Sequence, residues 1–249
     1  MSQYNRLAGV YDGLTADVPY GAFAGFYEHV FDLYGISPHM VLDMACGTGT
    51  LTAIMADRGY EMIAVDASEE MLAVAHEKTI NCRIKPLLLC QKLEELDLYG
   101  TVEAAVSSLD GLNYIPSEKL SEVYRRLHLF IEPGGVLVFD ILRPEALEAL
   151  DGQVFIDEND ETFCVWRTEY DSDSMSCRYG MDVFIRDADR WERSFEEHVE
   201  YAHPVDRVIS QLEAAGFDSV EVFNADRFID SIPAGDRDRR NFIAARRSL

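Results

Sequence analysis

Short apolar runs alternate with amphipathic helical stretches along the first 142 residues of the chain. This pattern predicts strands over 40–44, 61–65, 87–90, 102–108 and 136–141, and helices over 23–34, 51–58, 69–78 and 117–130. Gly35 and Gly59 are expected to end two of these helices, and Ser68 is expected to cap a third. Strands that alternate with helices of this length predict a doubly wound α/β fold, with a mostly parallel sheet covered on both faces.

The pattern changes after Pro144. A short helix is expected over 145–150, followed by β-rich pieces over 163–170, 175–185 and 191–201 with turn residues between them. We therefore expect an inserted antiparallel β subdomain over 151–201, within an α/β domain formed by residues 1–150 and 202–249. A helix after Pro204 and strands over 219–223 and 241–245 would complete that domain.

The chain is strongly acidic, which narrows the classes of partner. Its 249 residues hold 22 Lys and Arg against 45 Asp and Glu, a net charge of −23. Nucleic acids and anionic membranes would be repelled, so neither is expected as a partner. The N-terminus lacks an apolar signal core, and the five cysteines form no CxxC pair. These features favour a cytoplasmic protein without a metal site, and they leave its oligomeric state open.

The strongest motif is the segment from Asp43 to Gly49, in which a hydrophobic strand ends in an acid and enters a glycine-containing turn before a helix. Such a turn exposes backbone N–H groups to a ligand. A dinucleotide site would need a third glycine, but Thr52 occupies that position. A second acid, Asp66, ends the next predicted strand, where a carboxylate can accept both hydroxyls of a ribose.

The acid, the GxG-like turn and Asp66 resemble the first two motifs of class I S-adenosylmethionine-dependent methyltransferases. The segment 4–12, the loop 108–114 and the turn 132–135 are also similar to this family, most of all to bacterial YqeM-type proteins. The resemblance implies a seven-stranded Rossmann-like sheet, S-adenosyl-L-methionine as cofactor and a small-molecule acceptor. The residues that it implies for cofactor binding are Tyr11, Tyr20, Asp43, Ala45, Cys46, Gly47, Gly49, Asp66, Ala67, Met71, Gln91, Lys92, Leu93 and Ser108.

Some of these assignments have plainer alternatives. Tyr11 and Tyr20 are expected to form an aromatic lid over the cofactor, but each is equally compatible with ordinary packing. Where related sequences often carry an acid that contacts the adenine amino group, this chain has Gln91 and Lys92. Because Lys92 cannot accept that hydrogen bond, adenine recognition is expected to use Gln91, backbone groups or a hydrophobic wall.

On the acceptor side, Asp110, Asn113 and Tyr114 follow the fourth strand and are the candidate catalytic residues. Asp110 could take a proton or bind an amine, although a simple turn capped by Asn113 explains the same sequence. His198 and His203 flank the end of the inserted subdomain, where they could reach the pocket, but each is expected to face solvent. The two tryptophans of the chain, Trp166 and Trp191, are expected in the core of the inserted subdomain.

The sequence thus favours a small-molecule methyltransferase. Two alternatives stay open: a cofactor-binding docking protein without turnover, and, less favoured, a nicotinamide-dependent oxidoreductase.

The charge of the chain gives a direct test of the expectation about nucleic acids. We expect no tight, salt-sensitive retention of bulk tRNA or rRNA in a filter-binding assay, because phosphate groups would meet an acidic surface. Retention that weakens steeply as salt is raised would contradict the expectation.

Overall fold

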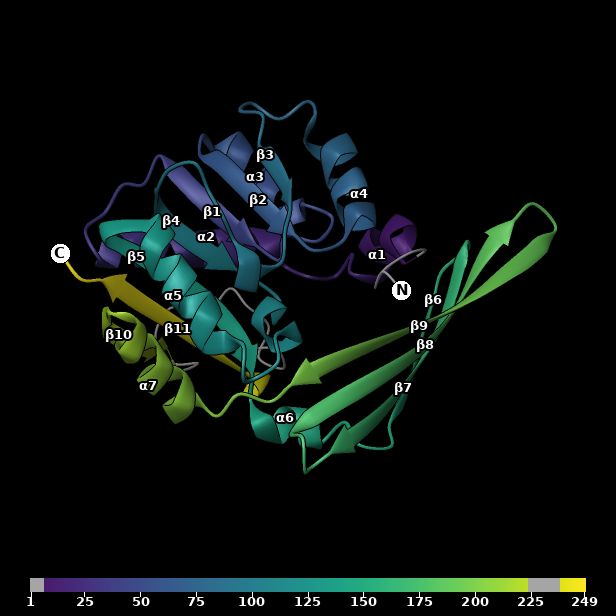
Figure 1. Cartoon of the computed structure of the whole chain (residues 1–249). Coiled ribbons are helices and arrows are strands. Elements are labelled where there is room, and N and C mark those ends of the chain that lie inside the picture. Colours follow the sequence, from purple (N-terminus) through teal and green to yellow (C-terminus); the bar gives the residue numbers. More distant parts are fainter. Residues whose placement is uncertain (1–6, 224–237) are drawn as a thin grey trace.

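The computed structural model describes residues 7–223 and 238–249, and it contains two separate β-sheets (Figure 1). The larger sheet has seven strands in the order β10-β11-β5-β4-β1-β2-β3. Five of them pair in parallel, and β11 runs antiparallel to both of its neighbours. The predicted doubly wound, mostly parallel sheet is therefore confirmed. Its strands are β1 (Met40–Met44), β2 (Glu61–Asp66), β3 (Leu87–Cys90), β4 (Val102–Ser107), β5 (Ile131–Leu142), β10 (Phe217–Phe223) and β11 (Arg240–Arg247).

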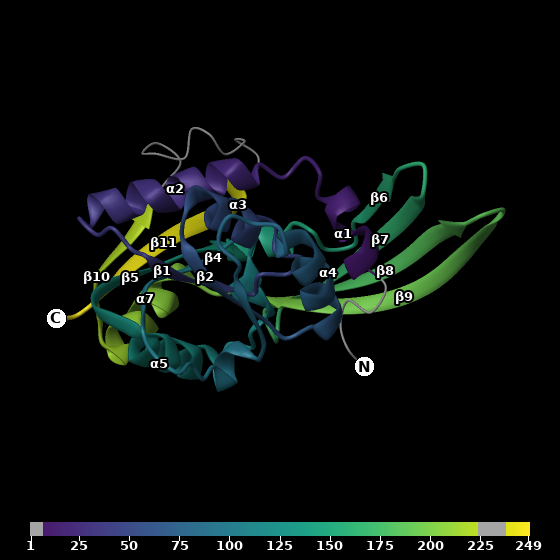
Figure 2. The same ribbon diagram turned by 90° about the horizontal axis from the view of Figure 1, so that it is seen from above.

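Helices cover both faces of this sheet, as Figure 2 shows with α2 on one side and α5 and α7 on the other. The two faces bury separate apolar clusters, one rich in aromatic rings from α2 and one built on α5 and α7. The helices are α1 (Ala8–Leu14), α2 (Tyr20–Leu33), α3 (Thr50–Arg58), α4 (Glu69–Thr79), α5 (Leu120–Phe130), α6 (Pro144–Glu148) and α7 (Val205–Ala215). None of the helices in the described part of the chain is both long and apolar enough to cross a membrane.

The turn between β1 and α3 depends on glycine. Ala45, Gly47 and Gly49 all have positive φ, so the chain reverses tightly between the end of β1 and the start of α3. A Cβ on Gly49 would lie 2.8 Å from the Cβ of Ala75 on α4. Gly49 therefore allows α4 to pack against the turn.

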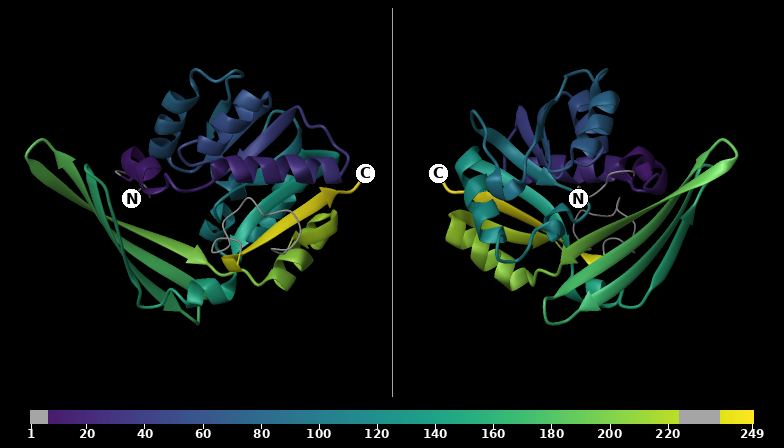
Figure 3. Two further views of the ribbon diagram at one scale, coloured as in Figure 1. Left: turned by 180° about the vertical axis from the view of Figure 1, so that it is seen from behind. Right: turned by 45° about the vertical axis from the view of Figure 1, so that its right-hand side comes forward.

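The smaller sheet is antiparallel, with the order β6-β7-β8-β9, and it projects from the seven-stranded core as a long arm (Figure 3). Its strands are β6 (Val154–Glu158), β7 (Thr162–Asp171), β8 (Ser176–Asp187) and β9 (Arg190–Tyr201). The last three match the predicted β-rich pieces, and the turns between them lie where the sequence predicts. The strand β6 was not predicted, because its three consecutive apolar residues are followed by a run of polar residues.

The close approach at Gly49 gives a stability test. Gly49→Ala should lower the free energy of unfolding by about 2–4 kcal/mol, because the methyl group meets Ala75 and the residue keeps a left-handed conformation. Urea denaturation measures the change. Gly35→Ala is the matched control, since Gly35 also has positive φ but a Cβ there would meet no atom within 4 Å, and about 1 kcal/mol is expected for it. Equal losses in the two variants would refute the packing role of Gly49.

Candidate active site

A cavity of about 730 Å³ opens at the carboxyl ends of β1, β2 and β4, between the core and the arm. Its volume is typical of ligand sites. The sequence analysis gave candidate residues for cofactor binding and for catalysis, and all but three of these candidates line the cavity. They are Tyr11, Tyr20, Ala45, Cys46, Gly47, Asp66, Ala67, Met71, Gln91, Lys92, Leu93, Ser108, Asp110 and Tyr114.

The other three, Asp43, Gly49 and Asn113, lie behind the cavity wall. Asp43 is 1% exposed and accepts a hydrogen bond from the hydroxyl of Thr52, while burial raises its pKa to about 7. Asn113 donates its amide to the carbonyl of Tyr201 (2.9 Å) and accepts from the N–H of Leu142 (3.0 Å). Asn113 therefore joins the ends of β5 and β9 to the loop after β4.

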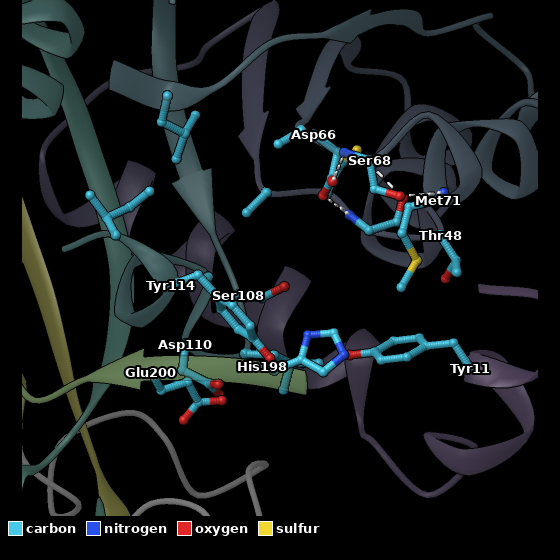
Figure 4. Close-up of a pocket in the computed structure, with 18 of the residues that line it drawn as sticks. Tyr11, Thr48, Asp66, Ser68, Met71, Ser108, Asp110, Tyr114, His198 and Glu200 are labelled. Atoms are coloured by element: carbon cyan, nitrogen blue, oxygen red, sulfur yellow. Dashed lines mark hydrogen bonds between the residues drawn. The ribbon is translucent and has the colours of Figure 1, made fainter. Parts of the chain in front are cut away.

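Asp66 lies at one end of the cavity, close to Ser68 and Met71 (Figure 4). Its carboxylate accepts the N–H of Gly47 (2.9 Å) and the N–H of Ser68 (2.9 Å), and burial raises its pKa. These bonds hold the carboxylate at the rim of the glycine turn. A carboxylate offers about four acceptor positions, so capacity remains for a ligand.

The loop after β3 contributes an apolar wall. The side-chain amide of Gln91 is engaged within its own loop, because it donates to the carbonyl of Asp97 and accepts the N–H of Asp97. Leu93 and Met71 are both buried and line the cavity. The sequence left Gln91, backbone groups or a hydrophobic wall as possible contacts for an adenine ring. Of these, the hydrophobic wall is the one that the structure supports most clearly.

The helix α1 lies between α4 and the arm in both Figure 1 and Figure 2. On the core side, Asp12 accepts a hydrogen bond from Thr48 (2.6 Å) and forms an ion pair with Lys78 (2.6 Å). On the arm side, the N–H of Leu7 donates to Glu196 (3.0 Å). The segment 4–12 was expected to start a lid. Its residues 7–12 bridge the core and the arm, and residues 4–6 lie outside the described part of the chain.

Acidic side chains gather at the end of the cavity away from Asp66. Glu200 accepts a hydrogen bond from the hydroxyl of Tyr179 (2.8 Å), and in Figure 4 its carboxyl group and that of Asp110 point toward one another. Burial and the charge of Asp110 raise the pKa of Glu200 to about 8. Arg240 forms ion pairs with Asp110 and with Asp140 (2.6 Å), so one cation offsets two carboxylates.

Two expectations about the arm and the segment after it are wrong. His198 and His203 are each only 2% exposed, not solvent-facing. His198 lines the cavity, as the sequence also allowed, and packs edge-on against Tyr114. His203 makes hydrogen-bond contacts with Ser117 and the carbonyl of Leu112. Trp191 is 48% exposed instead of lying in a core, because it is on the outer face of the arm.

Strand alternation could have identified the residues that sequence reasoning missed. Glu196, His198 and Glu200 recur at every second position of β9, so they share one face of the strand. That face is directed at the cavity, and Trp166, Tyr179 and Met181 join it from β7 and β8.

Comparisons with known proteins agree with this geometry. The methyltransferase domain family matches residues 41–135. YqeM of Bacillus subtilis (strain 168), which carries the name of a methyltransferase, is 29% identical over 97% of this chain and 96% of its own. The crystal structure of a S-adenosylmethionine-dependent methyltransferase from Clostridium acetobutylicum ATCC 824 has a TM-score of 0.83 at 27% identity, covering 99% of both chains. The chain thus carries a methyltransferase domain, and it is similar over nearly its whole length to S-adenosylmethionine-dependent methyltransferases.

The methyl donor of this methyltransferase is S-adenosylmethionine, the cofactor that the Clostridium acetobutylicum enzyme carries in its name. The cavity fits this molecule, because it combines a carboxylate with spare acceptor capacity, a glycine turn and an apolar wall. Its fold is also that of the sugar N-methyltransferase KedS8 from Streptoalloteichus sp ATCC 53650, with a TM-score of 0.78 at 21% identity over 96% of this chain and 93% of that one.

The position of Asp66 leads to a binding test. Asp66→Ala should weaken the affinity for S-adenosylhomocysteine roughly 10- to 100-fold, because charge-assisted hydrogen bonds to the ribose would be lost. Isothermal titration calorimetry measures the affinity, with thermal unfolding as a check of the fold. Glu69→Ala is the matched control, since Glu69 is exposed at the start of α4 and does not line the cavity. An unchanged affinity of the Asp66 variant would show that Asp66 does not hold the ribose.

Proposed function

We propose that the protein methylates an amino group of a small molecule, with Asp110 and Glu200 accepting the proton that the amine loses. The observation that carries this proposal is the buried acidic group at the end of the cavity away from Asp66. Among the described residues that form this group, Asp110, Asp140 and Glu200 lie beside the guanidinium of Arg240, so the acids are in excess. An acidic pocket favours an ammonium group over a neutral or anionic acceptor.

The donor half of the cavity has its own proposed roles. The turn at Gly47 would hold the methionine portion of the donor, Asp66 would bind the ribose, and Met71 with Leu93 would pack against the adenine. Tyr11 and Tyr20 would lie beside the sulfonium, since aromatic faces attract cations. Asp43 would act from behind the turn by supporting its geometry.

S-adenosylmethionine supplies a methyl group on a positively charged sulfur, which departs as a neutral thioether. The protein must align the acceptor with that methyl group, exclude water and remove a proton from the acceptor nitrogen. Glu200 suits the last task, because its raised pKa makes it a stronger base than an exposed carboxylate. Tyr179 holds the Glu200 carboxyl group in place, and His198 and Tyr114 form the adjacent wall.

Fold relatives are compatible with this chemistry. KedS8 is named as a sugar N-methyltransferase, and CalS10 as an amino pentose methyltransferase. Both act on small molecules by name, which supports a small acceptor here. The net charge of −23 also argues against a nucleic-acid substrate, and the free thiols of all five cysteines favour a cytoplasmic location.

We infer that residues 151–201 form a unit that selects the acceptor, while residues 1–150 and 202–249 hold the donor. The support is that this unit contributes five residues to the lining of the cavity: Trp166, Tyr179, Met181, His198 and Glu200.

The base role predicts a specific pH profile. Methyl transfer from radiolabelled S-adenosylmethionine to a panel of primary amines should rise with pH as Glu200 ionises, around its pKa of about 8. Glu200→Gln should lower kcat about 100-fold and remove that rise, because the amide cannot accept the proton.

Glu197→Gln is the control for this experiment. Glu197 is exposed on the other face of β9, where it pairs with Arg178, so its variant should keep both rate and profile. Methylation of the matching alcohols instead of the amines would refute the amine assignment. An unaltered profile in Glu200→Gln would refute the base.

A further inference from the structure

A second cavity of about 380 Å³ adjoins the first on the far side of the acidic group. The two cavities share a wall that consists of Asp110, Trp166, Tyr179, Glu200 and Arg240. A molecule in the second cavity therefore lies against the same carboxyl groups that face the donor cavity.

The rest of the second cavity combines apolar and charged residues. Leu142, Leu150, Phe155 and Ile156 are its apolar lining, and Asp157 and Arg239 its charged lining. Phe155 pairs with Trp166 of β7 across the arm, so the two rings share the face that carries the wall between the cavities. The Phe155 side chain is well exposed for a hydrophobic residue, at 43%. Exposed apolar side chains beside a concave surface are characteristic of ligand sites.

We propose that the second cavity binds the non-reacting body of the acceptor, and that the acceptor is an amine with an aromatic or alicyclic body of one or two rings. This inference rests on the proposed methylation of an amine and adds the class of its substrate. The amino group would reach Asp110 and Glu200 at the shared wall, while the ring would pack against Phe155 and Trp166. Apolar walls with a few convergent polar groups give a ligand both affinity and orientation.

This arrangement makes the ring as important for binding as the amino group. The carboxyl groups alone offer a small amine only one point of attachment, and water competes for it. A ring in the second cavity removes apolar surface of the ligand and of Phe155 from water at the same time. We therefore expect the affinity for an amine to depend on its body.

The two tryptophans of the chain allow binding to be measured without turnover. Trp166 lines both cavities, and Trp191 lies on the outer face of the arm. In a Trp191→Phe variant, Trp166 is the remaining fluorophore and reports directly on the shared wall. The variant, saturated with S-adenosylhomocysteine, is titrated with 2-phenylethylamine, ethylamine and 2-phenylethanol.

We expect a saturable change of Trp166 fluorescence with 2-phenylethylamine, and binding at least about tenfold weaker with ethylamine, which lacks the ring, and with 2-phenylethanol, which lacks the charge. Equal affinities for 2-phenylethylamine and ethylamine would overturn the ring subsite and leave the amine assignment intact. Equal affinities for 2-phenylethylamine and 2-phenylethanol would overturn the amine assignment and leave the subsite intact. Absence of saturation by both ring compounds would overturn the subsite.

A pair of phenylalanines on opposite faces of the arm provides the matched variants. Phe155→Ala, in the Trp191→Phe background, should weaken the binding of 2-phenylethylamine about tenfold and leave the affinity for ethylamine unchanged. Phe195→Ala should leave both unchanged, because Phe195 is 56% exposed and lines neither cavity. Unaltered affinity for S-adenosylhomocysteine shows that each variant is folded. Equal effects of the two substitutions would refute the role of Phe155.

Discussion

A single buried guanidinium holds together the part of the molecule where its acids converge. Arg240 begins β11, Asp140 lies on β5 and Asp110 follows β4, so these ion pairs join three segments that are remote in sequence. Burial alone would lower the pKa of Arg240, but the charges of the two carboxylates raise it above its usual value. Removal of one partner would leave an uncompensated buried charge, which is strongly destabilising. Glu200 adds a third acid to this place, and because the charge of Arg240 does not offset all of them, burial and the charge of Asp110 raise the pKa of Glu200.

The parts of the fold that follow from local pattern could be predicted from the sequence. Strands β1 and β3 have the predicted ends, because turn residues bound short apolar runs, and Ser68 caps α4 by accepting the N–H of Met71. The helix α1 was not predicted, since it is only seven residues long and two of them are glycines. Contacts with α4 and with the arm, not helix propensity, stabilise it.

The two halves of the cavity differed in how much the sequence revealed. The donor half comes largely from one strand–turn–helix–strand unit, so a short motif identified Gly47, Asp66 and Met71. The proposed acceptor half is assembled from β4, β9 and β11. Arg240 was not recognised, because its local sequence does not indicate that it pairs with two buried carboxylates. The sequence does not show whether His198 and Glu200 face solvent or a cavity. Polar residues at every second position of a strand form one polar face, and the pattern is the same in both cases.

The short turn between β8 and β9 determines which side chains of β9 face the cavity. Only Ala188 and Asp189 lie between the two strands, and the hairpin register then runs without a shift from Asp187 and Arg190 to Ser176 and Tyr201. Because side chains alternate between faces, one residue inserted or deleted in β9 near this turn would rotate the rest of the strand. The acids would then lie on the outer surface, and Phe195 would face inward. The length of a surface hairpin thus determines whether Glu196 and Glu200 face the cavity.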